Sequence, residues 1–251
     1  MPAEVRVVGL DGIPEVQPGD DLIAMIGDAI EASDTGLVDG DIVIITHKIV
    51  SKSEGQLVDL NTIEPSALAL TFSRRWNKDP RQTEVVLRES VRILRMERGV
   101  MICETRHGFI CANAGVDASN VPGDDSVCLL PAHPDDSAAT IRDGLTARFG
   151  TAPAVIITDS FGRPWRRGIT NVAIGVAGML PIADYRGTTD AWGHDLRVTI
   201  MAIADELAST AELVAGKTDA RPVAIVRGYA YPRGHGSARD LILEPDKDLF
   251  R

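Results

Sequence analysis

Unbroken apolar runs along the chain predict the centre of a β-sheet. Residues 42–45 and 154–157 contain only apolar side chains, which is typical of strands buried on both faces. Shorter apolar stretches predict further strands at residues 5–8, 100–104, 109–112, 127–130 and 222–226. Several of these strands follow one another with no helix between them. The pattern therefore favours a mixed α+β fold over a doubly wound parallel sheet.

Helical spacing of apolar residues predicts helices between these strands. Residues 20–32 carry a one-sided apolar stripe, and residues 197–215 are expected to form the longest helix. Asp79 followed by Pro80 should begin another helix, because Asp caps a helix and Pro suits its first turn. That helix is expected to continue through apolar residues on one side and basic residues on its solvated side: Leu87, Val91, Leu94, Arg88, Arg92 and Arg95.

A further helix is expected to open at His133-Pro134 and to stop at Gly150. The small residues of 171–178 indicate a backbone that packs closely against a neighbour, and residues 235–251 form a polar tail. There is no internal repeat and no low-complexity linker. We therefore expect one domain over residues 1–251.

Composition and charge narrow the classes of function. The 251 residues include 36 acidic and 26 basic residues, a net charge of −10. Nucleic-acid and anionic-membrane surfaces call for a basic face, so neither partner is expected. No apolar run approaches the length of a membrane span, and the chain does not start like a signal peptide, so a cytoplasmic protein is predicted.

Three cysteines, Cys103, Cys111 and Cys128, lie in apolar stretches without zinc-ligand spacing. Buried, reduced thiols are the expected state. A catalytic thiol is the alternative, but none of the three has an adjacent base in sequence.

Two segments concentrate polar chemistry. Residues 105–120 combine Arg106, His107, Asp117 and Asn120 with two glycines, and residues 158–168 follow a predicted strand. The second segment contains Asp159, Ser160, Arg163, Arg166 and Arg167, and its Asp159 and Ser160 are expected at the carboxyl end of that strand. Hard carboxylate oxygens suit divalent cations, and arginines suit phosphate. Together they indicate a metal and phosphate site, although Asp and Gly after a strand are also ordinary turn formers.

Residues 46–55 are rich in hydroxyls and cations, among them His47, Lys48 and Lys52. Taken alone, this segment also fits a solvated strand end and turn. The chain has no Gly-x-x-x-x-Gly-Lys phosphate loop, no Gly-x-Gly-x-x-Gly helix opening and no Gly-x-Ser-x-Gly elbow. A nucleotide would therefore need an unusual site.

In order and spacing, several long motifs resemble one family, the coenzyme F420:L-glutamate ligases, also called F420-0:gamma-glutamyl ligases. The resemblance covers residues 5–240 and rests on residues 40–55, 105–121, 156–168, 171–178 and 204–208, with Arg227-Gly228. It implies a GTP-dependent enzyme that joins L-glutamate to coenzyme F420-0, and further glutamates through γ-linkages, by way of an acyl phosphate. It also implies Mg²⁺ or Mn²⁺, a stimulating K⁺ ion, and an unusual α+β fold seen as an intertwined homodimer.

The resemblance also implies roles for particular residues. Asp117 and Asp159 would ligate one metal and Ser160 would serve a second, with Arg166 completing the catalytic set. From the local clusters of basic residues, rather than from the resemblance, we expect Arg106, His107, Arg163 and Arg167 to bind substrate anions. GTP would contact Ile13, Pro14, Glu15, Val16, His47, Lys48, Lys52, Asn120, Gly216 and Lys217.

The chain departs from the archaeal pattern at Lys217, where those relatives carry a glutamate that ligates metal. A charged lysine cannot ligate a cation, so Lys217 is expected to meet phosphate or to remain a solvated loop residue. Two other functions stay open beside the ligase: a metal-dependent phosphohydrolase or phosphotransferase that uses the same carboxylates, and a nucleotide-binding module without catalysis.

Overall fold

The computed structural model describes residues 4–119, 121, 123 and 125–248. Its centre is a five-stranded sheet in which only β2 and β8 run parallel. From one edge to the other, the strands are β1 (Arg6–Gly9), β12 (Val223–Arg227), β2 (Ile42–Thr46), β8 (Ala154–Gly162) and β9 (Ile169–Ala177). The predicted α+β class is therefore confirmed, and the two unbroken apolar runs lie at the middle of the sheet.

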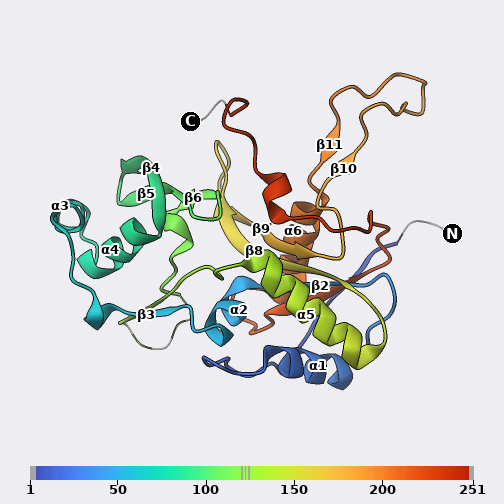
Figure 1. Cartoon of the computed structure of the whole chain (residues 1–251), viewed down its shortest axis with the longest axis horizontal. Helices are drawn as coiled ribbons and strands as arrows, with labels where there is room; N and C mark the ends of the chain where they lie inside the picture. The colour runs from blue at the N-terminus through green and yellow to red at the C-terminus, as the bar shows by residue number, and fades with distance from the viewer. Residues whose placement is uncertain (1–3, 120, 122, 124, 249–251) are drawn as a thin grey trace.

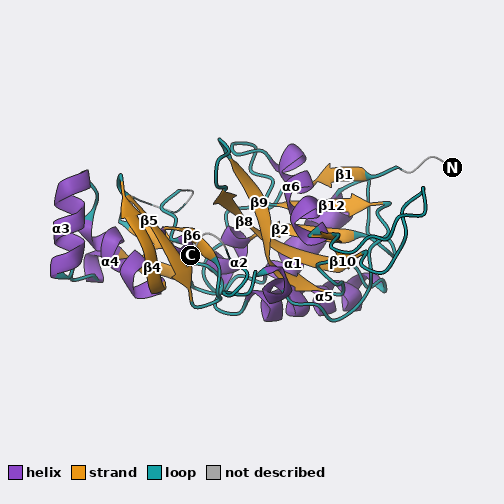
Figure 2. Cartoon of the chain, turned by 90° about the horizontal axis from the view of Figure 1, so that it is seen from above, coloured by secondary structure: helices purple, strands orange, loops and turns teal. Residues whose placement is uncertain are grey.

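Helices cover both faces of this sheet, which explains why its central strands are apolar throughout (Figure 2). On one face, α6 (Ile203–Ala215) packs over Ile44 and Ile156. On the other face, α1 (Leu22–Ala32) and α5 (Pro134–Phe149) pack over Val43 and Ile157. Successive residues of a strand point to opposite faces, so each central strand supplies both cores.

A small lobe lies beside the sheet, at the left of Figure 1. It consists of α3 (Ala67–Trp76), α4 (Pro80–Glu89), β4 (Ser90–Glu97), β5 (Val100–Thr105) and β6 (Ile110–Ala112), around its own core. The paired strands β3 (Leu57–Asp59) and β7 (Ser126–Cys128) connect it to the sheet. A hairpin of β10 (Ala183–Asp184) and β11 (Ile200–Met201) projects from the opposite side (Figure 1).

Two helix predictions were wrong. The helix that opens at Asp79-Pro80 ends at Glu89, and Val91 and Leu94 belong to β4, which pairs antiparallel with β5. The helix predicted at residues 197–215 begins only at Ile203, so α5 is longer than it. In the first case, pairing with a neighbouring strand overrides helical spacing in the sequence.

Other local signals are confirmed. Gly150 ends α5 in the left-handed conformation, with φ of 69°. The small-residue run also has the predicted close neighbour, since a Cβ on Gly175 would lie 2.4 Å from the carbonyl oxygen of Pro134. The polar tail contains a short turn of helix, η3 (Ala238–Leu241), whose Ala238 is buried. Among the described residues, no helix is long and apolar enough to cross a membrane.

Candidate active site

Segments far apart in sequence meet at one end of the central sheet, where the strands β1 and β2 finish; this end is called the sheet edge below. The backbone beyond β1 reaches the start of β12, where Leu10 N–H donates to the Val223 carbonyl at 2.8 Å. At the last residue of β2, Thr46 N–H donates to the Pro222 carbonyl at 2.9 Å. Loops at the carboxyl ends of strands are common ligand sites in such sheets. We call the polar residues gathered here the strand-end cluster: His47, Lys48, Lys52, Asp117, Asp159, Ser160 and Lys217.

The helix α2 (His47–Ser53) begins directly after β2 and supplies three members of the cluster. The turn interpretation of residues 46–55 is therefore wrong, because the segment is helical and its His47, Ser51 and Lys52 are buried. The spacing of four between Lys48 and Lys52 places both on one helix face. Lys52 forms an ion pair with Glu15 of the N-terminal loop.

His47 lies between the helix and the sheet. Its Nδ1 is 3.3 Å from Ser51 Oγ, and its Nε2 is 3.3 Å from Asp159 Oδ1. The Nε2 contact lacks hydrogen-bond geometry, so this buried nitrogen has no hydrogen-bond partner among the described residues. Buried polar atoms are normally paired, which marks this position as one suited to a further ligand.

Asp117 reaches the same helix from the small lobe. Its backbone bridges to Cys128, and its Oδ2 is 2.7 Å from Lys48 Nζ. Lys48 also donates to Ser119 Oγ at 2.7 Å. Burial raises the pKa of Asp117, but the Lys48 hydrogen bond and the Ser119 N–H outweigh it, and the pKa falls below its ordinary value. The carboxylate therefore stays charged at neutral pH.

Asp159 and Ser160 lie within β8, which continues to Gly162, and not at the end of a strand as predicted. They do lie beyond the last residue pair of the parallel strand β2, which joins Thr46 and Thr158. Their side chains are therefore at the sheet edge expected from the sequence, although the backbone there still pairs with β9.

Lys217 belongs to a polar network that also contains Ser160, Asn171 and Glu212. Its Nζ lies 2.9 Å from Ser160 Oγ and 3.4 Å from Glu212 Oε1. Ser160 Oγ donates to Asn171 Oδ1 at 2.8 Å, and Asn171 Nδ2 donates to Glu212 Oε2 at 2.9 Å. Sequence reasoning missed Asn171 and Glu212, since their only signals were a lone amide in an apolar run and an acid one turn before Gly216.

The remaining nucleotide-binding predictions fall on loops around this edge. Ile13 and Val16 are buried, Pro14 and Glu15 are exposed, and Gly216 has a positive φ of 61°. Asn120 lies outside the described residues.

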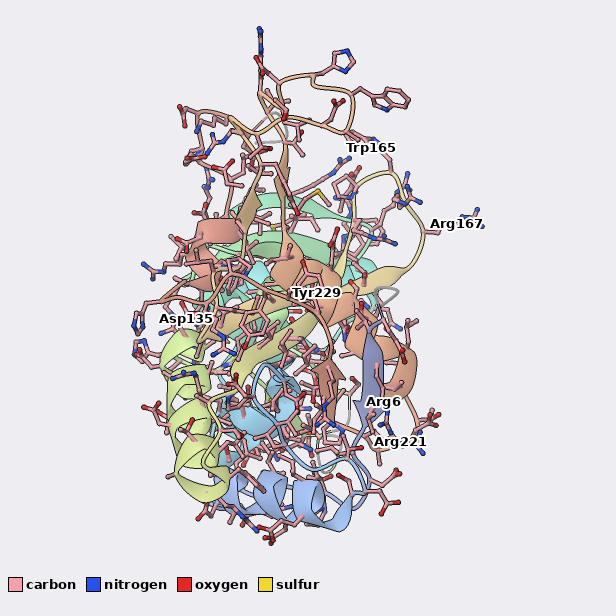
Figure 3. All side chains as sticks on the ribbon, turned by 90° about the vertical axis from the view of Figure 1, so that its right-hand side faces the viewer. Arg6, Asp135, Trp165, Arg167, Arg221 and Tyr229 are labelled. Atoms are coloured by element: carbon pink, nitrogen blue, oxygen red, sulfur yellow. The ribbon has the colours of Figure 1, made fainter. Side chains whose placement is uncertain are left out.

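The predicted arginine loop lies elsewhere. Arg163, Arg166 and Arg167 occupy the exposed tip of the β8–β9 hairpin, where Figure 3 shows Arg167 pointing outward. Within the described part of the chain, none of the three pairs with a carboxylate. The structure thus does not bring them into the strand-end cluster.

Arg106 and His107 lie on the small-lobe side, at the wall of a cavity of about 550 Å³. Arg106 forms an ion pair with Glu89. His107 Nε2 lies 2.9 Å from the Pro131 carbonyl. Burial lowers the pKa of His107, so the ring is neutral and its Nε2–H donates to that carbonyl.

Comparison with known proteins identifies the chain's relatives. Residues 12–228 match the family described as F420-0:Gamma-glutamyl ligase. The coenzyme F420:L-glutamate ligase of Methanothermobacter thermautotrophicus is 44% identical over 253 residues, covering 98% of this chain and 99% of the relative. That of Methanopyrus kandleri is 45% identical over 242 residues, 94% of each chain. The chain belongs to the F420-0:gamma-glutamyl ligase family. The family and the enzyme class predicted from the sequence, a ligase, are confirmed.

The cluster of this ligase fits a hard divalent cation. Its oxygen donors are the carboxylates of Asp117 and Asp159 and the hydroxyl of Ser160, the donor types that Mg²⁺ and Mn²⁺ prefer. Each Asp117 oxygen makes one hydrogen bond within the chain and keeps a lone pair for a metal. In the described residues, no three acidic, His or Cys side chains form a complete metal site. Nucleotide phosphates would supply further oxygens.

The surroundings of the three cysteines favour the expected buried, reduced thiols over a catalytic thiol. All three are buried and free. Burial, with the nearby Asp159 charge, raises the pKa of Cys111 to about 12, and burial raises that of Cys128 to about 11. A catalytic thiol needs the opposite shift.

Proposed function

We propose that the chain catalyses the GTP-dependent addition of L-glutamate to coenzyme F420-0, releasing GDP and phosphate, in coenzyme F420 biosynthesis. The observation that carries this proposal is the strand-end cluster, in which two carboxylates lie against successive residues of α2. Lys48 contacts Asp117, and His47 contacts Asp159.

The chemistry of this ligation explains the composition of the cluster. The substrate carboxylate attacks the γ-phosphate of GTP to give an acyl phosphate, which the glutamate amine then opens. One anion attacks another in the first step, so positive charge must offset their repulsion and stabilise the transferring group. The ammonium groups of Lys48, Lys52 and Lys217 supply fixed charge at the sheet edge.

Asp117 and Asp159 would hold one divalent cation, Mg²⁺ or Mn²⁺, and Ser160 would serve a second; a bound cation adds Lewis-acid stabilisation of phosphate charge. The loops carrying Ile13–Val16 and Gly216-Lys217 would bind the nucleotide, and K⁺ would add to the charge compensation. Lys217 would partly replace the second metal ion, since its ammonium lies on Ser160 Oγ.

We also propose an intertwined homodimer. The β10–β11 hairpin projects from the body of the chain and exposes Tyr185, Trp192, Val198 and Ile200, with Trp192 87% exposed. Exposed apolar clusters of this kind mark interaction sites. A second copy would cover this surface and would allow the arginine loop of one chain to approach the other.

Incubation with GTP, Mn²⁺ and L-glutamate, with and without F420-0, tests the proposed reaction. GDP release that requires F420-0, together with a mass gain of one glutamyl unit on F420-0, supports the ligase. GDP release indifferent to F420-0 would indicate a phosphohydrolase. Binding without turnover would indicate a nucleotide-binding module.

A further inference from the structure

The 550 Å³ cavity beside His107 is separate from the residues of the strand-end cluster. Its volume falls in the range of pockets that hold cofactor-sized molecules. It lies between the small lobe, the start of α5 and η3. The side chains that line its floor are apolar, whereas those at its rim are charged.

The floor of the cavity is apolar and contains an aromatic surface. Phe109, Leu130 and Ile174 are at most 7% exposed. The His107 ring stacks on Phe109 with centroids 5.7 Å apart and planes 19° from parallel. Near-parallel rings of this kind favour a flat aromatic ligand, which can pack in an offset stack.

The rim of the cavity carries charges of both signs, and the exposed carboxylate of Asp136, like the guanidinium of Arg239, has no ion-pair partner among the described residues. Arg239 is exposed, and its guanidinium has no partner among the described residues. Arg106, in contrast, forms an ion pair with Glu89. The α5 N-terminus also opens here without a side-chain cap. Its first acid, Asp135, is already occupied by Ser237 and by backbone N–H groups. Arg239 is therefore the rim group that suits an anion.

The cavity adjoins the strand-end cluster through two aromatic rings. Phe161 lies edge-on to Phe109, with centroids 6.3 Å apart. Phe161 is two residues after Asp159 in β8, so both side chains face the same side of the sheet. The cavity floor is thus connected to the strand that carries Asp159 through the Phe109–Phe161 contact.

We propose that this cavity binds the acceptor coenzyme F420-0, which the family resemblance implies is a deazaflavin with an acidic arm: its flat ring lies against the His107–Phe109 floor and its acidic arm lies at the Arg239 rim. This inference rests on the proposed ligase function, because it assigns a substrate of that reaction. L-glutamate is too small to fill such a cavity and has no use for an aromatic floor. The nucleotide is the other flat anionic ligand, and its predicted contacts lie around the N-terminal loop and residues 216–217.

Equilibrium binding of F420-0 in the absence of GTP and glutamate tests the assignment. Ala132→Trp narrows the cavity, and Arg239→Glu reverses the charge of its rim. Each should weaken F420-0 binding about tenfold or more, with GTP binding and the KM for glutamate unchanged. The matched controls are Ala139→Trp, on an exposed position of α5, and Arg74→Glu, on α3. Both should bind F420-0 like the parent chain.

The outcomes separate this inference from the proposed function. Unchanged F420-0 binding in both cavity variants, or selective loss of GTP or glutamate binding instead, would overturn the assignment even if the parent chain ligates glutamate. A parent chain that binds F420-0 through this cavity but adds no glutamate would overturn the proposed reaction and leave the assignment standing.

Discussion

The ammonium of Lys217 lies 2.9 Å from the hydroxyl of Ser160, although 57 residues separate the two in sequence. The contact places a fixed positive charge at the position where the family resemblance implies a glutamate that ligates metal. Glu212 lies on the other side of the ammonium, at 3.4 Å. A carboxylate is therefore present next to Ser160 after all, but it is that of Glu212 on α6, and it pairs with the Lys217 ammonium.

Lys217→Glu should weaken GTP binding and make activity depend more steeply on Mn²⁺ concentration. The substitution removes the fixed cation and sets a second carboxylate beside Glu212, so free metal must supply more of the charge compensation. A metal titration and the KM for GTP measure this. Lys247→Glu, at an exposed position near the C-terminus, is the control. An unchanged titration and KM would make Lys217 a solvated loop residue.

Asp159→Asn should preserve the fold and lower kcat on the order of a hundredfold or more, because a neutral amide binds a divalent cation more weakly than a carboxylate and the cation stabilises the transferring phosphoryl group. Steady-state kinetics at saturating Mn²⁺, with a thermal melt to check folding, measures the effect. The exposed Asp34→Asn variant should keep full activity. Near-normal turnover in Asp159→Asn would remove this residue from the proposed metal site.

Arg166→Ala and Arg167→Ala should raise the KM for GTP or for F420-0 if the arginine loop grips substrate anions. The loop is exposed in the single chain, so the effect would show that the loop contacts bound substrate, from the same chain or from a partner subunit. Arg6→Ala, on β1 at the far edge of the sheet, is the control. If both KM values stay unchanged in both loop variants, the loop does not bind substrate.

If the proposed dimer forms through the hairpin, Trp192→Ser combined with Val198→Ser should convert it to monomers, because the two side chains are the most exposed apolar residues of the projecting hairpin. Light scattering after size-exclusion chromatography gives the mass. Leu213→Ser is the control, at a position of α6 that is 83% exposed. A variant that keeps the mass of the parent chain would show that the hairpin does not form the interface.

Lys48→Met should lower stability in a way that depends on pH. The pKa of Asp117 is depressed in the folded chain, so its pairing stabilises the fold above the unfolded-state pKa of about 3.9 and is lost as pH falls through the folded value. The difference in Tm between the parent and Lys48→Met should therefore be present at pH 7 and shrink below about pH 4. Lys78→Met provides the exposed control. A difference independent of pH would mean that Lys48 acts through packing alone.

Much of the central sheet was predictable because burial on both faces leaves an unmistakable run of apolar residues, as in β2 and β8. The error after Glu89 has a definite cause. Val91 and Leu94 are spaced by three, which fits a helix, yet this segment pairs with β5 and its register includes shifts that only the tertiary structure sets. Local spacing cannot reveal a partner strand of this kind.

The candidate site likewise contains residues that local motifs predict and residues that only tertiary contacts reveal. Asp117, Asp159 and Lys52 were expected from dense local motifs and from the family resemblance, and the structure brings their segments to one sheet edge. Asn171 and Glu212 escaped notice, because 41 residues separate them and only the packing of α6 on β9 places the amide against the carboxylate. The cavity floor was equally hidden, since it joins Phe109, which directly precedes β6, to Ile174 of β9 in the core of the central sheet.

His47 and Lys48 are consecutive residues of one short helix, yet they contact carboxylates that come from different bodies of the fold. Asp159 belongs to the central sheet, whereas Asp117 follows Val116, a core residue of the small lobe. The gap between the two carboxylates is thus fixed by how the lobe sits against the sheet. A slight tilt of the lobe about the β3–β7 connection would alter that gap while leaving both hydrophobic cores intact. The distance between the two carboxylates of the proposed site therefore depends on the orientation of the small lobe relative to the central sheet.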